Sequence, residues 1–192
     1  MKLLEKYLKE ITLSDEQKVK KEMNVGAAVV VKKGENGELL ALIIQRAKED
    51  AWPNHWEIPR GKCDFGNENK KGEENIRSCT IRECKEEVGL DIIPIKFIDK
   101  FSYLADKGTR KSTQYNFLCK LKNPNQKVKL SNEHQDFKWI QTVGEAELYV
   151  VPETKKTLSK VLNLGAPLVD YPENKLSDEK ITEIVNKYLR VL

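Results

Sequence analysis

Two apolar, β-rich runs joined by a short turn constrain the fold of this chain more than any other feature. The runs cover residues 25–31 and 39–44, and the turn residues Gly34, Asn36 and Gly37 lie between them. Unbroken apolar runs of this length, bounded by turn residues, are typical of buried strands. We therefore expect a buried β-hairpin.

Patterns of both helix and strand occur along the rest of the chain. Strand-like segments lie near residues 91–103, and apolar and polar residues alternate at 115–121 and again around Phe137 and Trp139. Helical patterns occupy the segments 3–11, 73–88, 152–162 and 177–192. Because strands dominate the middle and helices interrupt and end it, we expect a mixed α/β or α+β fold.

The length of 192 residues suits one domain with short appendages. We expect an N-terminal helix and connector at residues 1–23, a core domain at 24–165, and a C-terminal helical extension at 166–192 that packs on the core. No stretch approaches the roughly 18 uncharged apolar residues of a membrane-spanning helix, so we expect no membrane partner. The formal charge of +4 is too small to imply nucleic-acid binding by itself.

The cysteine pattern predicts free thiols. The four cysteines are Cys63, Cys79, Cys84 and Cys119. No two of them form a C-x-x-C pair, and the chain has only two histidines, which disfavours a structural zinc site. Charged residues interrupt the leucines of residues 1–11, so no signal-peptide core is present there. We therefore expect a reducing, cytoplasmic location.

One face of the helix expected at 73–88 carries three carboxylates. At about 100° per residue, Glu83, Glu86 and Glu87 fall within an arc of roughly 100°. The apolar residues of a different face, suited to a core contact, are Ile81, Cys84 and Val88. Carboxylates at this spacing repel one another unless cations neutralise them, and such oxygen-rich clusters suit hard cations such as Mg²⁺. A solvated surface helix is the alternative.

These residues resemble the signature of the Nudix hydrolases, G-x5-E-x7-R-E-U-x-E-E-x-G-U, in which U is a bulky apolar residue. The matching residues are Glu74, Arg82, Glu83, Glu86, Glu87, Gly89 and Leu90. Cys84 stands where an aliphatic residue is usual. If Gly61 is the first glycine, twelve residues rather than five separate it from Glu74. The extra seven lie in the polar stretch 64–71, which can loop out without disturbing the helix register.

The resemblance implies a Nudix fold, a mixed sheet between helices (α/β/α), and hydrolysis of a nucleoside diphosphate linked to another moiety. The ligands that it implies for divalent cations, Mg²⁺ or Mn²⁺, are Glu83, Glu86, Glu87 and Glu74. Arg82 would orient the acids, and Gly61 would bring backbone groups close to phosphate. Such cations lower the pKa of water and neutralise charge on the phosphates, as cleavage of a pyrophosphate bond requires.

A second cluster, at residues 131–139, resembles the glutamate-His…Trp segment of the diadenosine tetraphosphate hydrolases of this family. Glu133 is a candidate general base or extra metal ligand, and a solvated loop acid is the alternative. His134 is a candidate for hydrogen bonding to phosphate, and a local backbone cap is the alternative.

Cations and aromatic residues near these motifs are candidates for substrate binding. Arg46 ends the second apolar run, while Arg60 and Lys62 bracket Gly61 in what we expect to be an anion-facing turn. Tyr103 and Tyr115 are candidates for stacking on a base.

Our leading hypothesis is a Mg²⁺-dependent pyrophosphohydrolase, monomeric or homodimeric, whose partner is a small nucleotide. The substrate we expect is a dinucleoside polyphosphate such as diadenosine tetraphosphate, giving ATP and AMP. Hydrolysis of the mRNA 5′ cap or of a diphosphoinositol phosphate is the enzymatic alternative, and lysines at 62–71 and 120–129 would then hold RNA. A non-catalytic, nucleotide-sensing Nudix module is the third reading, which the three repelling carboxylates disfavour.

Overall fold

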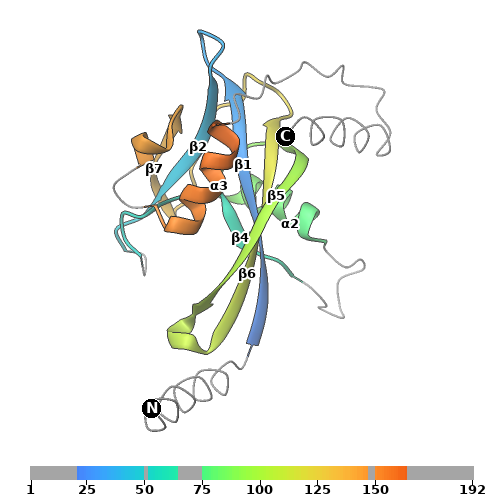
Figure 1. Cartoon of the computed structure of the whole chain (residues 1–192), viewed down its shortest axis with the longest axis vertical. Helices are drawn as coiled ribbons and strands as arrows, with labels where there is room; N and C mark the ends of the chain where they lie inside the picture. The colour runs from blue at the N-terminus through green and yellow to red at the C-terminus, as the bar shows by residue number, and fades with distance from the viewer. Residues whose placement is uncertain (1–20, 50–51, 65–74, 147–149, 164–192) are drawn as a thin grey trace, which may run out of the picture.

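The computed structural model describes residues 21–49, 52–64, 75–146 and 150–163 (Figure 1). The helices expected at 3–11 and 177–192, Glu74 and most of the insertion lie outside the described residues. No helix in the described ranges is both long and apolar enough to cross a membrane.

A seven-stranded mixed sheet forms the centre of the described structure. Its strands are β1 (Lys21–Lys33), β2 (Leu39–Arg46), β3 (Trp56–Glu57), β4 (Arg60–Lys62), β5 (Ile92–Ala105), β6 (Arg110–Leu121) and β7 (His134–Ile140). The order is β3-β2-β1-β6-β5, with β4 paired to β1 and β7 paired to β2. The pair β1–β6 is parallel and the other strand pairs are antiparallel. The expected hairpin is the pair β1–β2.

Two helices cover opposite faces of this sheet, α2 (Ile76–Val88) and α3 (Pro152–Leu162). Side chains alternate along β1, so Ala27, Val29 and Val31 pack in one core cluster with α3, while Ala28 and Val30 pack in the other with α2. The apolar run at 25–31 is unbroken because both faces of β1 are buried, one in each core. The expected α/β/α sandwich is confirmed.

Both ends of α2 are capped, which fixes where its acidic face points. The side chain of Asn75 accepts a hydrogen bond from the Ser78 backbone N–H at 2.9 Å. Gly89 has a φ of 70°, and its N–H donates to the Lys85 carbonyl oxygen at 3.0 Å. Gly89 is thus the helix-ending glycine that the sequence predicts.

The apolar face of α2 differs from the expected one at Ile81. Cys84 and Val88 are fully buried, but Ile81 is 37% exposed. The buried residue on the preceding turn is instead Thr80, which packs on β1 so closely that a Cβ at Gly26 would lie 2.7 Å from its Oγ1. This close approach of the helix to β1 turns Ile81 outward.

Residues 56–62 form two short strands instead of a strand that ends in a turn. β3 pairs with β2, and β4 pairs with β1 so that Gly61 lies opposite Gly26. Arg60 and Lys62 are therefore strand residues, and the expected turn around Gly61 is wrong.

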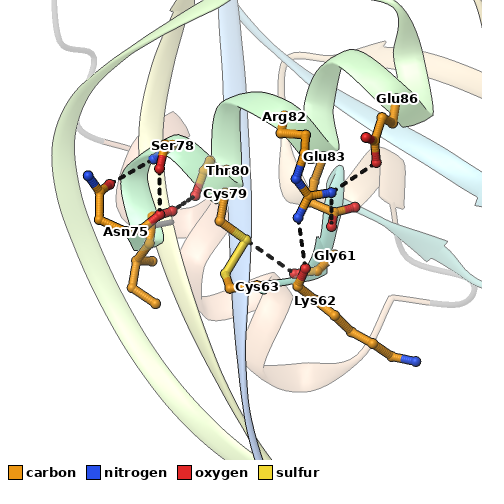
Figure 2. The surroundings of a disulfide bond; sticks show 11 residues. Gly61, Lys62, Cys63, Asn75, Ser78, Cys79, Thr80, Arg82, Glu83 and Glu86 are labelled. Carbon is orange, nitrogen blue, oxygen red and sulfur yellow. Dashed lines mark hydrogen bonds and ion pairs between the residues drawn. A yellow bond between two sulfur atoms is a disulfide. The ribbon is translucent and has the colours of Figure 1, made fainter. Parts of the chain in front are cut away.

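Cys63 and Cys79 form a disulfide that joins the residue after β4 to α2 (Figure 2). The expectation of free thiols is wrong for this pair and confirmed for Cys84 and Cys119, both of which are free and buried. The pairing of β4 with β1, together with the packing of α2 on β1, brings together two cysteines that lie 16 residues apart in the sequence. Sequence spacing alone does not reveal this proximity.

Candidate active site

The three carboxylates of the α2 face differ sharply in exposure. The Glu87 side chain is about one-tenth exposed and that of Glu83 is 13% exposed, whereas that of Glu86 is 60% exposed. The face is thus not a solvated one: two acids point into the protein and one points out.

Arg82 binds two of these carboxylates (Figure 2). Its Nη1 donates to Glu83 Oε1 at 2.7 Å and to Glu86 Oε2 at 2.9 Å, and its Nη2 donates to the Lys62 carbonyl oxygen at 3.0 Å. Arg82 therefore holds both Glu83 and Glu86 in place and also ties the acidic face to β4.

Gly61 lies directly beneath Glu83. A Cβ at position 61 would overlap the Glu83 carboxylate, so only glycine lets the carboxylate approach the β4 backbone this closely. The Lys62 side chain extends away from the acidic face in Figure 2.

Glu87 is the most buried of the three acids. Its Oε2 accepts a hydrogen bond from the Arg60 backbone N–H at 2.8 Å. Burial raises the pKa of the Glu87 carboxyl well above its ordinary value, and the charges of Glu57 and Glu83 raise it further, against the opposing effect of the Arg60 N–H. A bound cation would relieve this unfavourable negative charge.

The donor chemistry of this face fits a divalent cation, although the acids are not drawn together. In the described part of the chain, no group of three or more acidic, histidine or cysteine side chains is arranged so that it could hold a metal ion as it stands. Glu83 and Glu87 nevertheless offer carboxylate oxygens, which hard cations prefer, and Glu87 is costly to ionise without one. In this structure the guanidinium group of Arg82 balances the negative charges of Glu83 and Glu86.

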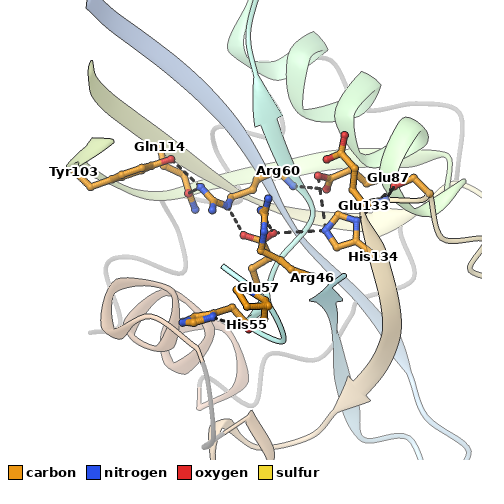
Figure 3. Close-up of polar contacts among 11 residues, drawn as sticks. Arg46, His55, Glu57, Arg60, Glu87, Tyr103, Gln114, Glu133 and His134 are labelled. Carbon is orange, nitrogen blue, oxygen red and sulfur yellow. Dashed lines mark hydrogen bonds and ion pairs between the residues drawn. The ribbon is translucent and has the colours of Figure 1, made fainter. Parts of the chain in front are cut away.

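Another acidic residue, Glu57 on β3, lies next to this face and is held by two arginines (Figure 3). Its Oε1 accepts from Arg46 Nη1 at 2.6 Å and its Oε2 from Arg60 Nε at 2.7 Å. Burial alone would raise the pKa of the Glu57 carboxyl, but Arg60, His134 and Arg46 outweigh it and lower the pKa to about 2.

Arg60 also reaches β5 and β6. Its Nη1 donates to the Tyr103 hydroxyl at 2.7 Å and to Gln114 Oε1 at 3.3 Å. Tyr103 is thereby part of the same cluster. Tyr115 follows Gln114 on β6, so it faces the other side of that strand, where its ring lies 6.4 Å from that of Phe97.

His134 is the first residue of β7, and its side chain is fully buried. Its Nε2 lies 3.5 Å from Glu57 Oε1 and 4.0 Å from Glu87 Oε1. Within the described structure this nitrogen makes no hydrogen bond. The imidazole thus faces two carboxylates and not the solvent.

Glu133 precedes β7 and is exposed. Its segment is tied to α2, because the Ser131 N–H donates to the Glu87 carbonyl oxygen at 2.8 Å, and to β2, because the Ala47 N–H donates to the Glu133 carbonyl oxygen at 2.9 Å. Glu133 thus directly precedes the buried His134 on a segment that contacts both α2 and β2.

The structure therefore gathers most of the residues that the sequence singles out. The residues gathered by side-chain or close contacts are Arg46, Arg60, Gly61, Arg82, Glu83, Glu86, Glu87, Tyr103 and His134. Lys62 and Glu133 are tied to their neighbours by backbone hydrogen bonds. Sequence reasoning missed Glu57 and Gln114. The charge of Glu57 between Trp56 and Ile58 in a strand is a signal that would have found it, whereas Gln114 carries no such signal.

Comparison with known proteins places this arrangement in a family. The asymmetrical bis(5'-nucleosyl)-tetraphosphatase of Caenorhabditis elegans is 31% identical over 118 residues, which are 60% of this chain and 77% of that protein. The mouse enzyme of the same name is 29% identical over 111 residues, 56% of this chain and 69% of that one.

Among solved structures, a C. elegans Ap4A hydrolase binary complex matches with a TM-score of 0.57 and 25% identity over 74% of this chain and 96% of that chain. The MutT protein of Methanosarcina mazei, at 19% identity and a TM-score of 0.55 over 73% of this chain and 93% of that chain, shares the fold. The family model described as the NUDIX domain matches residues 22–161, a range that contains every residue of the gathered site. The chain therefore belongs to the NUDIX family.

Proposed function

We propose that the protein hydrolyses a dinucleoside polyphosphate such as diadenosine tetraphosphate to ATP and AMP with the help of Mg²⁺. Family membership gives the reaction class, that of a pyrophosphohydrolase. The observation that carries the proposal is the acidic face of α2 packed on Gly61, with Glu87 buried and its pKa raised. The names of the relatives support the choice of substrate.

The carboxylates would hold the metal. Glu83 and Glu87 face inward and would be the principal ligands, and Glu86 would join them from the exposed side, with Glu74 as a further ligand. Mg²⁺, or Mn²⁺ in its place, lowers the pKa of a bound water and neutralises charge on the phosphates. Arg82 would keep Glu86 oriented, as it does in this structure.

The cations and aromatic residues of the cluster would hold the substrate. Arg46 and Arg60 would face the phosphates, with Lys62 at the edge of the site, and Tyr103 would stack on a base. Tyr115 could stack on a nucleotide base only on the other face of β6. His134 faces Glu57 and Glu87, which favours a role in orienting Glu87 over contact with phosphate.

Glu133 is the candidate for the group that takes a proton from the attacking water. It lies on a segment attached to α2 at Glu87, which suits a general base or an added metal ligand. We propose the general base and test it below.

Incubation of the pure protein with diadenosine tetraphosphate and Mg²⁺ tests the substrate assignment, with products separated by chromatography. We expect ATP and AMP in equal amounts. Capped RNA and a diphosphoinositol phosphate are assayed in parallel, and faster turnover of either one would replace the proposed substrate.

We also propose a cytoplasmic enzyme that is monomeric or homodimeric. Light scattering on the protein as it elutes from a size-exclusion column measures its molar mass and so distinguishes a monomer from a dimer. The Cys63–Cys79 disulfide is the observation against a cytoplasmic location, because cytosolic thiols are kept reduced. Alkylation of the thiols in intact cells before lysis tests the location: alkylated Cys63 and Cys79 support the cytoplasm, and an intact disulfide contradicts it.

A further inference from the structure

Glu57 is a nearly buried carboxylate with a separate arginine on each oxygen (Figure 3). It is 5% exposed, and Arg46 from β2 and Arg60 from β4 donate to its two oxygens at 2.6 and 2.7 Å. A buried charge of this kind is costly unless it is paired, so both guanidinium groups are held firmly.

The two arginines are held beside the buried metal-ligand candidate. The backbone N–H of Arg60 donates a hydrogen bond to Glu87 Oε2 at 2.8 Å. Glu57 and Glu87 are close to each other, because His134 Nε2 lies within 4.0 Å of both carboxylates. A guanidinium group released from Glu57 would therefore find Glu87 within reach of its flexible side chain. The other acceptors of Arg60, the Tyr103 hydroxyl and the Gln114 amide oxygen, are neutral and bind a guanidinium less strongly than a carboxylate does.

We propose that Glu57 is a positioning residue that sequesters the guanidinium groups of Arg46 and Arg60, and so leaves the Glu87 carboxylate available to a divalent cation. This inference rests on the proposed function. Without the charge of Glu57, the arginines pair with Glu87 and compete with the metal. With it, they stay paired with Glu57, and their side chains remain partly exposed, so phosphates can meet them.

Mn²⁺ binding to the full chain tests this role apart from catalysis. Binding is monitored through the loss of the electron paramagnetic resonance signal of the free ion. We expect Glu57→Gln to weaken Mn²⁺ binding by about tenfold or more, the usual effect of a residue that orients a ligand. Adding Arg60→Met to Glu57→Gln removes one competing guanidinium but keeps the backbone N–H at position 60. We expect the double variant to recover affinity by at least about threefold over the single variant.

The rescue separates positioning from a structural role, because removing a second buried contact cannot repair a merely damaged fold. If Glu57→Gln does not fold, Glu57→Asp with and without Arg60→Met carries the same test, since it keeps the charge but withdraws the carboxylate. Affinity of a folded Glu57 variant within about twofold of the parent, or no recovery in the double variant, overturns the proposal.

Asp106→Asn is the matched control. Asp106 is another carboxylate paired with an arginine, Arg110 at 3.2 Å, and it lies at the connection between β5 and β6. We expect the Mn²⁺ affinity of this variant to equal that of the parent, and equal weakening in Asp106→Asn would overturn the proposal. If the parent binds no Mn²⁺, the metal assignment fails and the inference fails with it. If the parent binds Mn²⁺, Glu87→Gln does not and Glu57→Gln binds normally, the inference alone fails.

Discussion

At the scale of single residues, Glu87 carries a charge that the apo protein accommodates poorly. Its pKa is raised chiefly by burial and then by Glu57 and Glu83, so the folded state binds a proton more readily than the unfolded state. Stability therefore falls as pH rises above the unfolded pKa of about 4.5, since the ionised form is the disfavoured one in the fold.

Glu87→Gln removes this penalty. We expect the metal-free variant to melt at a higher temperature than the parent at about pH 8, with the gain vanishing near pH 4. In the presence of Mg²⁺ the same substitution should lower kcat by at least about 100-fold, because a ligand charge is lost. Melting curves at both pH values measure the first effect. An unchanged or lower melting temperature at about pH 8 would contradict the account.

Glu133→Gln distinguishes three roles of one exposed acid. A general base contributes about 10²- to 10⁴-fold, so its loss should lower kcat strongly with little change in KM. A metal ligand should instead give a rate that raised Mg²⁺ partly restores. A solvated loop acid leaves both parameters within about twofold of the parent, and the base role would then pass to a helix carboxylate. The measurement is kcat and KM across a Mg²⁺ series.

At the scale of elements, the contact between α2 and β4 builds the site. Gly61 is required where the Glu83 carboxylate lies against β4, because a Cβ there would overlap it. We expect Gly61→Ala to lower kcat/KM by about tenfold or more through displacement of Glu83. Gly144→Ala is the control, because a Cβ at Gly144 would meet Thr142 Oγ1 at an ordinary 3.7 Å. Equal activity of the two variants would contradict this role of Gly61.

The Cys63–Cys79 disulfide joins the same two elements. For a loop of this length we expect reduction to lower the free energy of unfolding by about 3 kcal/mol. Burial raises the pKa of the Cys84 and Cys119 thiols, so both should react slowly in the folded protein. Thiol titration of unfolded protein should give two thiols before reduction and four after it. Four thiols in protein prepared without reductant would show that the bond does not form.

At the scale of the whole molecule, local patterns predict the elements and leave the contacts between them open. The run at 25–31 predicts β1, Gly89 predicts the end of α2, and the carboxylate spacing predicts the acidic face, because each depends on neighbours in the sequence. The outward turn of Ile81 depends instead on how closely α2 approaches Gly26. That distance is set by packing across the sheet, which periodicity does not encode.

The polar contacts across the sheet were equally beyond sequence reasoning. From Arg60 on β4 they continue through Gln114 and Asn116 on β6 to Asp99 on β5. The pairing of β4 with β1, of β1 with β6 and of β6 with β5 brings these residues together. Glu57 is a mixed case, because Arg60 lies only three residues away in the sequence, whereas Arg46 reaches Glu57 through the pairing of β2 with β3.

The central claim is that the buried acidic face of α2 binds a divalent cation for hydrolysis, and a Mg²⁺ titration of diadenosine tetraphosphate turnover tests it most directly. The parent, Glu87→Gln and Glu153→Gln are compared, the last being an exposed acid of α3 on the opposite face of the sheet. The account predicts saturable Mg²⁺ activation of the parent and of Glu153→Gln, abolition by a chelator, and a kcat at least about 100-fold lower for Glu87→Gln. Turnover of Glu87→Gln equal to that of the parent at saturating Mg²⁺ would contradict it.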